Sequence, residues 1–496
     1  MKAFGIQLCA LLLAAAPAAA GQSLLSGTVF ADRNGNGLRE RGERGLGSIP
    51  VSNGDTVVLT DHRGRFTLPT TSEQDLFVLV PAGWRMVEPG KEAAPCGGPE
   101  DSLRGASLSE PVFALTRCEE PRRFRMAAVG DLQVADSAEL AYARRTVLSE
   151  LSGRKDLAFS LMLGDLVNDD PRMMPAVADA LHRLPHPVRC LVGNHDRDVV
   201  PRGSHLPRGR TAFCRHFGAA DYAFDYGPVR FIVLDNSSSG YRFSDRQLRL
   251  VRQLLRLTPA RQPLVLAFHV PLASTANGDA LLALLGERPA LILSAHLHSV
   301  VRRCWAPGVV ELTVGAPCGS WWVGERDPDA VPVALQQCGA PRNYFTIDFS
   351  EHGYSLAFKG VGLDASRQAE VWIAGEEPLD RQIPALAGLP DGYVVVNLYG
   401  GCEETLVEMR LDDGPWIRIP PKRMVAPTVS RVAWWNRHGG YPTCSARRIP
   451  LRRVASPHLW AAQLPADAIT GSHRLRIRAR DPYGLDVELE RLFAIH

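Results

Sequence analysis

The 496-residue sequence has little of several features that would point to particular classes of protein. Its formal net charge is only +3, so the composition gives no reason to expect a nucleic-acid partner. After the first twenty residues no apolar run is long enough to span a bilayer. No two cysteines form a Cys-x-x-Cys pair, so a structural zinc site built on thiolates is not expected.

The rest of the composition is that of a globular protein. Hydrophobic residues make up 45% and charged residues 22%, which excludes a mostly disordered or collagen-like chain. At roughly 150 residues per domain, the length predicts about three domains.

The first twenty residues have the three-part pattern of a secretory signal peptide. Lys2 is followed by an apolar stretch and then by Ala18-Ala19-Ala20 before Gly21, the expected mature start. A membrane anchor is the competing interpretation, but Pro17 and the small residues after it argue against one. We therefore expect a periplasmic or secreted protein with no membrane span.

Nine of the ten cysteines remain after removal of residues 1–20, in a compartment where disulfides persist. An odd number leaves at least one unpaired. Two pairs within single domains are plausible, namely Cys96 with Cys118 and Cys402 with Cys444.

The hydrophobic pattern divides the mature chain into three segments. Short alternating runs separated by turn residues predict a β-sandwich over residues 21–120. From 121 to 365, apolar strands alternate with helical periods at 138–151, 173–184 and 245–257, which is typical of α/β layering. Short strands return at 366–496, where we expect a second β-sandwich.

Five strand-like runs in the middle segment end on residues that can bind a metal. Ligands collect outside the carboxyl ends of strands in open α/β sheets, so these ends should meet at one rim. Carboxylates and imidazoles together suit Mn, Fe or Zn, and two such ions can hold a phosphoryl group. Turn capping alone does not explain three histidines at strand ends. The residues at these ends are Asp131, Asp165, Asn194, His195, Asp196, His269, His296 and His298.

In chain order, these blocks resemble the signature of the calcineurin-like metallophosphoesterase superfamily. That signature is Asp-x-His, Gly-Asp-x-x-x-Asp, Gly-Asn-His-Asp/Glu, a lone His, and Gly-His-x-His. Here the blocks are Asp131-Leu-Gln133, Gly164-Asp-Leu-Val-Asn-Asp169, Gly193-Asn-His-Asp196, His269 and Ala295-His-Leu-His298. Flanking segments such as 314–322 and 408–416 resemble exported bacterial members with N- and C-terminal β-domains. The resemblance implies a central four-layer α/β/β/α sandwich flanked by two β-sandwich domains.

The resemblance also implies a role for each of these residues. Two divalent metals (Mn, Fe or Zn) would bind, with Asp165 bridging them. Hydrolysis of a phosphate mono- or diester would proceed through a metal-bridging hydroxide, with no covalent enzyme intermediate. His195 would stabilise the transition state or protonate the leaving oxygen, and Asp196 would orient its ring. The first metal would be completed by Asp131, Gln133 and His298, and the second by Asn194, His269 and His296.

Gln133 is the main departure from the signature, because most relatives have His there. An amide oxygen is a weaker ligand for transition metals than imidazole. Either the first metal binds less tightly or Gln133 only hydrogen-bonds a metal water. The departure keeps open an alternative function, an exported binding protein with a degenerate, weakly active site. The expected substrate is a small-molecule or envelope phosphoester.

A second possible metal site lies in the N-terminal segment. The spacing Asp-x-Asn-x-Asn-Gly-x5-Glu is that of a calcium loop, although here it lies between strands. A structural Ca ion and a simple Asn/Gly-rich turn are both compatible with the pattern. The residues concerned are Asp32, Asn34, Asn36 and Glu43.

Two further features near the expected rim allow two interpretations each. Arg202, Arg208, Arg210 and Arg215 lie in an insert at 201–215 and either contact substrate phosphate or cover a solvated loop. The pair Trp321 and Trp322 either lines the substrate cleft or packs in a core.

Overall fold

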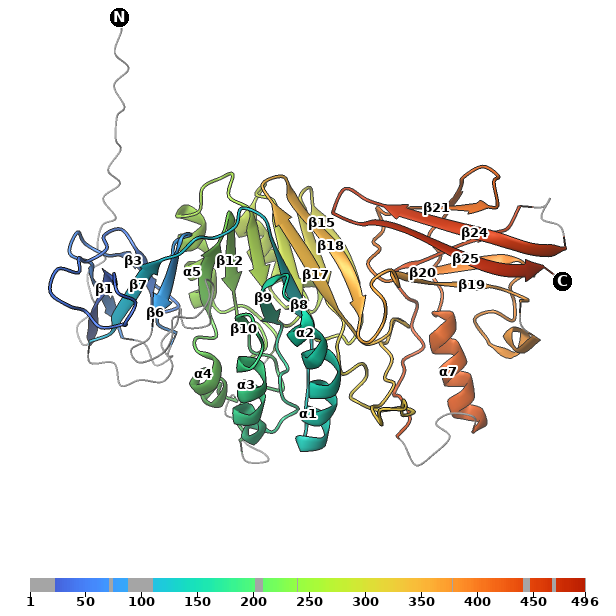
Figure 1. The fold of residues 1–496 in the computed structure, drawn as a ribbon, viewed down its shortest axis with the longest axis horizontal. Helices are drawn as coiled ribbons and strands as arrows, with labels where there is room; N and C mark the ends of the chain where they lie inside the picture. The colour runs from blue at the N-terminus through green and yellow to red at the C-terminus, as the bar shows by residue number, and fades with distance from the viewer. Residues whose placement is uncertain are drawn as a thin grey trace, which may run out of the picture.

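The structure is a computed structural model whose three parts follow one another along the long axis of the molecule (Figure 1). It describes residues 23–70, 75–87, 110–200, 208–238, 240–376, 378–439, 447–465 and 470–495. The predicted signal peptide, residues 1–20, lies outside the described residues. Within the described ranges, no helix is both long enough and apolar enough to cross a bilayer.

The N-terminal part consists of two small sheets with a shared core. Strand β4 shows why: Phe66 and Leu68 are buried while Arg65 and Thr67 are exposed, so alternate side chains face the second sheet. Val51 of the second sheet belongs to the same apolar cluster. In spatial order, the first sheet is β4 (Arg65–Pro69), β1 (Leu24–Ala31), β7 (Val112–Arg117) and β6 (Trp84–Val87), and the second is β3 (Val57–Leu59), β2 (Pro50–Ser52) and β5 (Phe77–Val78).

The central part contains two larger sheets, both of which are mixed. Each combines parallel neighbours with antiparallel strands toward its edges. The five-stranded sheet has the order β10 (Val188–Cys190), β9 (Leu157–Met162), β8 (Phe124–Val129), β17 (Asn343–Ser350), β18 (Gly353–Gly360). The six-stranded sheet has the order β11 (Tyr222–Tyr226), β12 (Val229–Val233), β13 (Leu264–Ala267), β14 (Ala290–Ser294), β16 (Val309–Thr313), β15 (Val301–Ala306).

Two helices of the central part begin at recognisable capping signals. Asp136 caps the first helix, and Ser244 with Gln247 forms a capping box on α5. The predicted helix at 138–151 contains a π-helical turn. The helices are α1 (Ser137–Ala143), η2 (Arg144–Leu148), α2 (Ser149–Gly153), η3 (Pro171–Met173), α3 (Met174–His182), α4 (Thr211–Phe217), α5 (Asp245–Arg256), η4 (Leu272–Ser274) and α6 (Gly278–Leu285).

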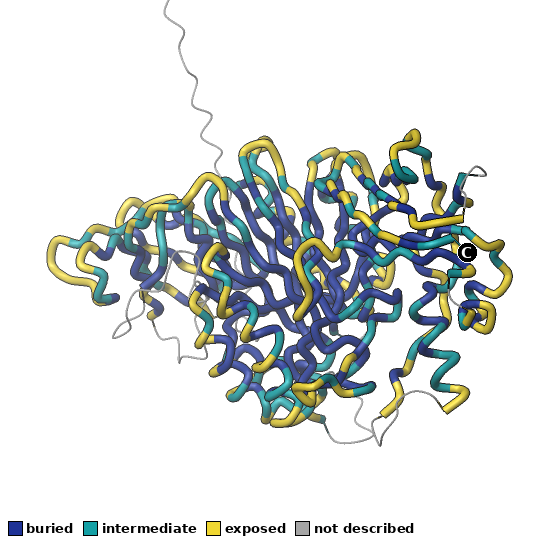
Figure 2. Tube along the Cα trace, turned by 45° about the vertical axis from the view of Figure 1, so that its right-hand side comes forward, coloured by how far each residue is buried: buried dark blue, intermediate teal, exposed yellow. Residues whose placement is uncertain are grey.

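The two central sheets share one apolar core, and Figure 2 shows that buried residues fill the middle of the molecule. Phe159 of the five-stranded sheet packs edge-on against Phe231 of the six-stranded sheet, with ring centroids 5.5 Å apart. The opposite face of the five-stranded sheet packs on α1, α2 and α3, and that of the six-stranded sheet on α5 and α6. The α/β class is therefore confirmed, and the parallel strands bring their carboxyl ends to one side.

The C-terminal part also has two sheets around an apolar core. Helix α7 was not predicted from the sequence. It packs Val429 against Trp372 and Val395, covering the outer face of the three-stranded sheet. The sheets are β19 (Ala369–Ile373), β20 (Tyr393–Leu398), β23 (Leu459–Gln463) and β22 (Ile417–Ile419), β21 (Leu406–Leu411), β24 (Gly471–Arg480), β25 (Asp486–Ile495), and the helices are η5 (Pro378–Gln382) and α7 (Pro427–His438).

The structure describes only one cysteine of each expected disulfide pair. Cys96 and Cys444 lie outside the described residues. Cys402 is a free, buried thiol whose sulfur lies 3.4 Å from a guanidinium nitrogen of Arg302. The structure therefore does not contain the expected pair of Cys402 with Cys444.

Candidate metal centre

The loops that follow β9 and β10 approach each other closely at two glycines. Gly164 precedes Asp165 and Gly193 precedes Asn194. A methyl group at Gly193 would lie 2.1 Å from Oδ1 of Asp165, and one at Gly164 would lie 2.8 Å from the amide nitrogen of Gly193. Only glycine allows such an approach, so backbone contact sets the spacing of these two loops.

Left-handed backbone conformations gather around the predicted rim. Eight of the eleven non-glycine residues with positive φ among the described residues belong to this region. Such conformations are costly for residues with a Cβ and concentrate at functional sites. The eight are Gln133, Asp165, Asp169, Tyr241, His296, His298, Trp321 and Trp322.

Asp165, His269 and His296 form the tightest group of potential ligands. One ligand atom from each lies within 4.8 Å of the other two. Nε2 of His269 is 3.1 Å from Oδ2 of Asp165, while the other Asp165 oxygen accepts a hydrogen bond from the His195 amide at 2.8 Å. The structure thus joins the ends of β9, β13 and β14, which come from different sheets.

Asp131 and His298 extend this group on one side. Oδ1 of Asp131 lies 3.6 Å from Nε2 of His298 and 3.9 Å from Nε2 of His269. Nδ1 of His269 donates to the Leu163 carbonyl at 2.7 Å, and Nδ1 of His298 donates to the Gly319 carbonyl at 2.5 Å. These carbonyls fix the tautomers that leave both Nε2 atoms free to bind a cation.

The buried polar atoms at the centre are those that a cation would satisfy. Oδ1 of Asp131, Nε2 of His269 and Oδ1 of Asn194 are buried without a hydrogen-bond partner within the described part of the chain. Unpaired buried polar atoms are rare and costly. Two carboxylates, three imidazoles and amide oxygens form a donor set for borderline divalent ions, so the residues present fit the expected metals.

The electrostatics of the centre agree with this assignment. Burial opposes the charged form of His269, but Asp165 and Asp131 outweigh it and raise the pKa of His269 to about 9. Burial and the neighbouring His269 ring lower the pKa of His296 to about 4. Burial raises the pKa of Asp131. The carboxylates around His269 thus favour positive charge at this point, which a divalent cation would supply.

The backbone amide of Gln133 donates to the Asp165 carbonyl at 2.7 Å, but among the described residues its side chain makes no polar contact with the ligand group. Its side chain is buried, and Oε1 lies 3.9 Å from the Cys318 sulfur. That sulfur is also 3.7 Å from Nδ1 of His298. Sequence reasoning did not single out Cys318, because no motif marks it. It is a buried thiol, and burial raises its pKa well above the ordinary value.

His195 is oriented by a carboxylate other than the one expected. Its Nδ1 lies 2.9 Å from Oδ2 of Asp169, and its side chain is 28% exposed. Asp196 is fully buried and instead accepts hydrogen bonds from the amides of Leu166, Val167 and Gly193 at 2.8–3.0 Å. Asp196 therefore links the loop that follows β9 to the loop that follows β10 through hydrogen bonds. The resemblance pointed to Asp196 for the orientation of the ring, and the structure has Asp169, from the Gly-Asp motif, in that position.

The arginine-rich insert divides into different environments. Arg208 donates to Oδ1 of Asp169 at 2.9 Å, while Arg210 belongs to a buried ionic network. Arg215 is exposed on α4, and Arg202 lies outside the described residues. Neither sequence interpretation describes Arg210, which is too buried to cover a solvated loop and is paired with carboxylates.

The two tryptophans also separate. Trp322 is buried and donates from Nε1 to the Leu132 carbonyl at 2.9 Å, so it packs in a core. Trp321 is partly exposed, with its ring centroid 4.9 Å from that of His298. Tyr241, which no sequence signal identified, lies 5.2 Å from His296 in an edge-on arrangement. Two aromatic rings therefore border the imidazole side of the centre.

The proposed calcium loop forms a tightly hydrogen-bonded turn. Asp32 accepts from the amides of Gly35 and Gly37, each at 2.7 Å, and Glu43 accepts from the amides of Arg33 and Glu40. Asn34 and Asn36 donate to the Glu40 carboxylate. Calcium at Asp32, Asn34, Asn36 and Glu43 stays a prediction.

Two family models match consecutive parts of the chain. The model for calcineurin-like phosphoesterase matches residues 124–300, which include every residue assigned above to the metal centre. A second, described as the C terminal of calcineurin-like phosphoesterase, matches residues 311–486. A search of curated protein sequences gave no match.

Several solved structures are similar to parts of the chain. A dimetal phosphatase from Danio rerio is 16% identical with a TM-score of 0.35, covering 48% of this chain and 96% of that one. The purple acid phosphatase PPD1 from yellow lupin seeds is 12% identical with a TM-score of 0.36, covering 68% and 66%. Vps29 from Chaetomium thermophilum is 14% identical with a TM-score of 0.24, covering 47% and 88%.

Proposed function

We propose that this chain, which belongs to the calcineurin-like metallophosphoesterase superfamily, hydrolyses phosphoric esters with the help of two divalent cations. One observation carries the proposal above the others. Asp131, Asp165, His269, His296 and His298 come together from the ends of four strands, and two of them hold buried ligand atoms without hydrogen-bond partners in the described structure. Such a cluster is costly unless a cation completes it.

Each residue has a separate task in this proposal. Asp165 has contacts to both the His269 side and the His195 loop, so it is placed to serve two ions. Asp131 and His298 would bind one ion, and Asn194, His269 and His296 the other. When bound, the two cations supply the Lewis acidity and the activated water that phosphoester hydrolysis needs.

His195 provides the proton in this proposal. Asp169 accepts a hydrogen bond from Nδ1 of His195, which leaves Nε2 to face the substrate and protonate the leaving oxygen. Arg208 holds the other oxygen of Asp169 and so keeps this carboxylate in place. The partly exposed rings of Tyr241 and Trp321 lie where the leaving group would pass.

The setting and architecture of the enzyme complete the proposal. The residue 1–20 pattern supports export to the periplasm or beyond, with a small-molecule or envelope phosphoester as substrate and no nucleic-acid partner. A four-layer α/β/β/α sandwich at 121–365, between β-sandwich domains at 21–120 and 366–496, is the arrangement we assign. The sheets that face each other across one core support it.

The direct test is hydrolysis of p-nitrophenyl phosphate and bis-p-nitrophenyl phosphate by the mature protein. Mn, Zn, Fe or Mg is added to metal-stripped protein, and His195→Ala is the control. We expect turnover that requires metal and falls about 100-fold or more in the control. The preferred ester separates a monoesterase from a diesterase. Failure to bind any of the four metals would overturn the proposal.

Gln133 supports the second candidate, an exported binding protein with a degenerate site. Its side-chain amide contacts a thiol, and among the described residues that side chain makes no polar contact with the ligand group. Protein that binds metal but hydrolyses neither ester, while Gln133→His gains turnover, would favour this candidate.

A further inference from the structure

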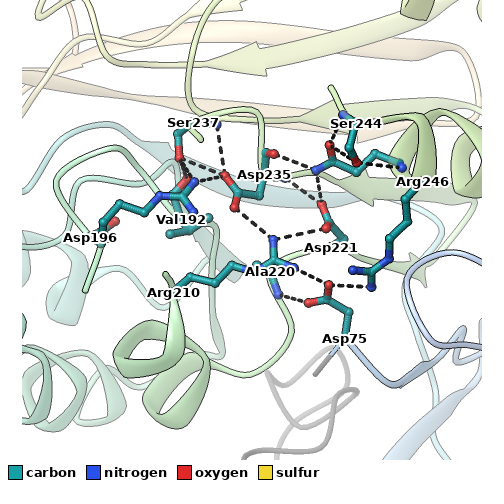
Figure 3. A network of polar contacts seen from close by, with 12 residues as sticks. Asp75, Val192, Asp196, Arg210, Ala220, Asp221, Asp235, Ser237, Ser244 and Arg246 are labelled. Atoms are coloured by element: carbon teal, nitrogen blue, oxygen red, sulfur yellow. Dashed lines mark hydrogen bonds and ion pairs between the residues drawn. The ribbon is translucent and has the colours of Figure 1, made fainter. Parts of the chain in front are cut away.

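A buried ionic network joins the N-terminal part of the chain to the central part (Figure 3). It contains three carboxylates and three guanidinium groups, and none of the six side chains is more than 15% exposed. The members are Asp75, Asp221, Asp235, Arg197, Arg210 and Arg246.

Among the described residues, Asp75 is the charged member that the N-terminal part contributes. Asp75 lies two residues before β5, and its side chain is fully buried. Its carboxylate is paired with Arg210 and with Arg246, the latter at 2.9 Å, and accepts the Ala220 amide at 3.1 Å. The N-terminal part thus places one negative charge inside the central part.

The network leads from Asp75 to the loop that contains His195. Arg210 bridges to Asp235 at 3.0 Å, and Asp235 is paired with Arg197, two residues after His195. Ser237 accepts a hydrogen bond from Arg197 at 2.7 Å and donates to the Val192 carbonyl, three residues before His195. Both ends of the His195 loop are therefore attached to the same charged network.

A second connection reaches the His195 ring itself. Arg208 donates to the Arg197 carbonyl at 3.2 Å and to Asp169 at 2.9 Å, and Asp169 holds Nδ1 of His195. A shift of the Arg197 backbone would thus move both the His195 loop and the carboxylate that orients the ring.

We propose that Asp75, a residue of the N-terminal part, is a positioning residue for His195. The inference rests on the proposed function, because it assigns His195 a proton-transfer role. Asp75 is an ion-pair partner of both Arg210 and Arg246 in a network that is largely buried. Removing the Asp75 charge takes this partner from both guanidinium groups, so Arg210 must pair differently with Asp235. Arg197, and with it the His195 loop, then shifts.

The test compares leaving groups on metal-loaded full-length protein. Protonation by His195 matters more for phenyl phosphate, whose leaving group is strongly basic, than for p-nitrophenyl phosphate. For Asp75→Asn we expect kcat for phenyl phosphate to fall about 10- to 100-fold, with a smaller loss for the nitrophenyl ester and little change in KM. Partial unfolding lowers both rates equally and leaves their ratio unchanged.

Asp55→Asn is the matched control. Asp55 also joins the N-terminal part to α5, through Arg249 at 2.8 Å, but the pair is half-exposed and separate from the network. Its rate ratio should equal that of the wild-type protein. Asp75→Glu keeps the charge but adds a methylene group at a fully buried position, so its ratio should lie between those of Asp75→Asn and the wild-type protein. It replaces Asp75→Asn as the reporter if that variant does not fold.

The outcomes separate this inference from the proposed function. Wild-type protein without metal-dependent turnover overturns the proposed function. Active wild-type protein with an unchanged ratio in folded Asp75→Asn, or in Asp75→Glu where only that variant folds, overturns the role of Asp75.

Discussion

The two junctions on either side of the central part are built differently. The N-terminal junction depends on the charge of Asp75 inside the six-membered network. At the C-terminal junction, neutral hydrogen bonds predominate: His458 meets the Val300 carbonyl at 2.9 Å, and Gln337 accepts from the Arg452 amide at 2.7 Å. That junction has one buried ion pair, Arg302 with Asp481, among the contacts described for it.

Each junction supports a different half of the metal centre. The N-terminal one is connected to the loop of Asn194 and His195, at the five-stranded sheet. The C-terminal one is connected to His298, whose carbonyl accepts the Gln337 amide at 2.9 Å, at the six-stranded sheet. A junction that depends on balanced charges can be disturbed by one neutralised carboxylate. In a junction of neutral hydrogen bonds, the stabilising free energy is divided among several groups that each contribute about 1 kcal/mol.

Replacing Asp165 should affect both halves of the metal centre, because its carboxylate contacts residues of both. We expect Asp165→Asn to lower kcat about 1,000-fold or more, since the loss of several kcal/mol of cation binding and charge stabilisation acts on both ions. Turnover of p-nitrophenyl phosphate and metal content by mass spectrometry measure the effect. Full metal content with normal turnover would contradict the central place given to Asp165.

Asp481→Ala breaks the ion pair of the C-terminal junction. The expected cost is about 3–5 kcal/mol of unfolding free energy, because Arg302 is left buried without its charge partner. Urea unfolding of the metal-loaded protein measures it. The ratio of phenyl to p-nitrophenyl turnover should stay at the wild-type value, unlike that of Asp75→Asn. A changed ratio would show that both junctions position His195, which would contradict the difference that we describe between them.

Gln133→His tests the difference between the two halves by giving the first ion a second imidazole ligand, as the second ion already has. We expect metal binding about tenfold tighter, equivalent to about 1.4 kcal/mol, because imidazole is a better ligand than an amide. Competition with a fluorescent chelator gives the affinity. An unchanged affinity would mean that the side chain at position 133 does not reach the ion.

Gln337→Ala is the mildest change to the C-terminal junction. Its side chain joins Ser320, Pro450 and the Arg452 amide, so its loss should cost about 1–2 kcal/mol of unfolding free energy. Thermal unfolding measures it, and kcat should change less than twofold at 25 °C. A loss as large as that of Asp481→Ala would show that neutral contacts are not dispersed in the way we describe.

Sequence patterns sufficed for features with a local cause. The alternation in residues 65–68 predicted a strand, and the helical periods predicted α3 and α5. The apolar runs before Asp131, Asp165 and His269 predicted that these residues follow strands, and the structure brings them together at one rim.

Features that depend on distant parts of the chain could not be predicted in this way. Whether Asp169 or Asp196 faces the His195 ring depends on how two loops pack. The partners of Arg210 are 11, 25 and 135 residues away in sequence. Helix α7 has a weakly amphipathic pattern, and its position depends on the sheet face that it covers.

The contact between Gly164 and Gly193 limits how this protein could diversify. A library that varies Tyr241, Trp321 or the insert would retain the ligand geometry, because backbone packing sets the distance between the Asp165 and Asn194 loops. A library at either glycine would yield almost exclusively inactive clones, since a single methyl group forces those loops apart. Substitutions around the site can therefore change the substrate preference, while the two glycines keep the spacing of the metal ligands constant.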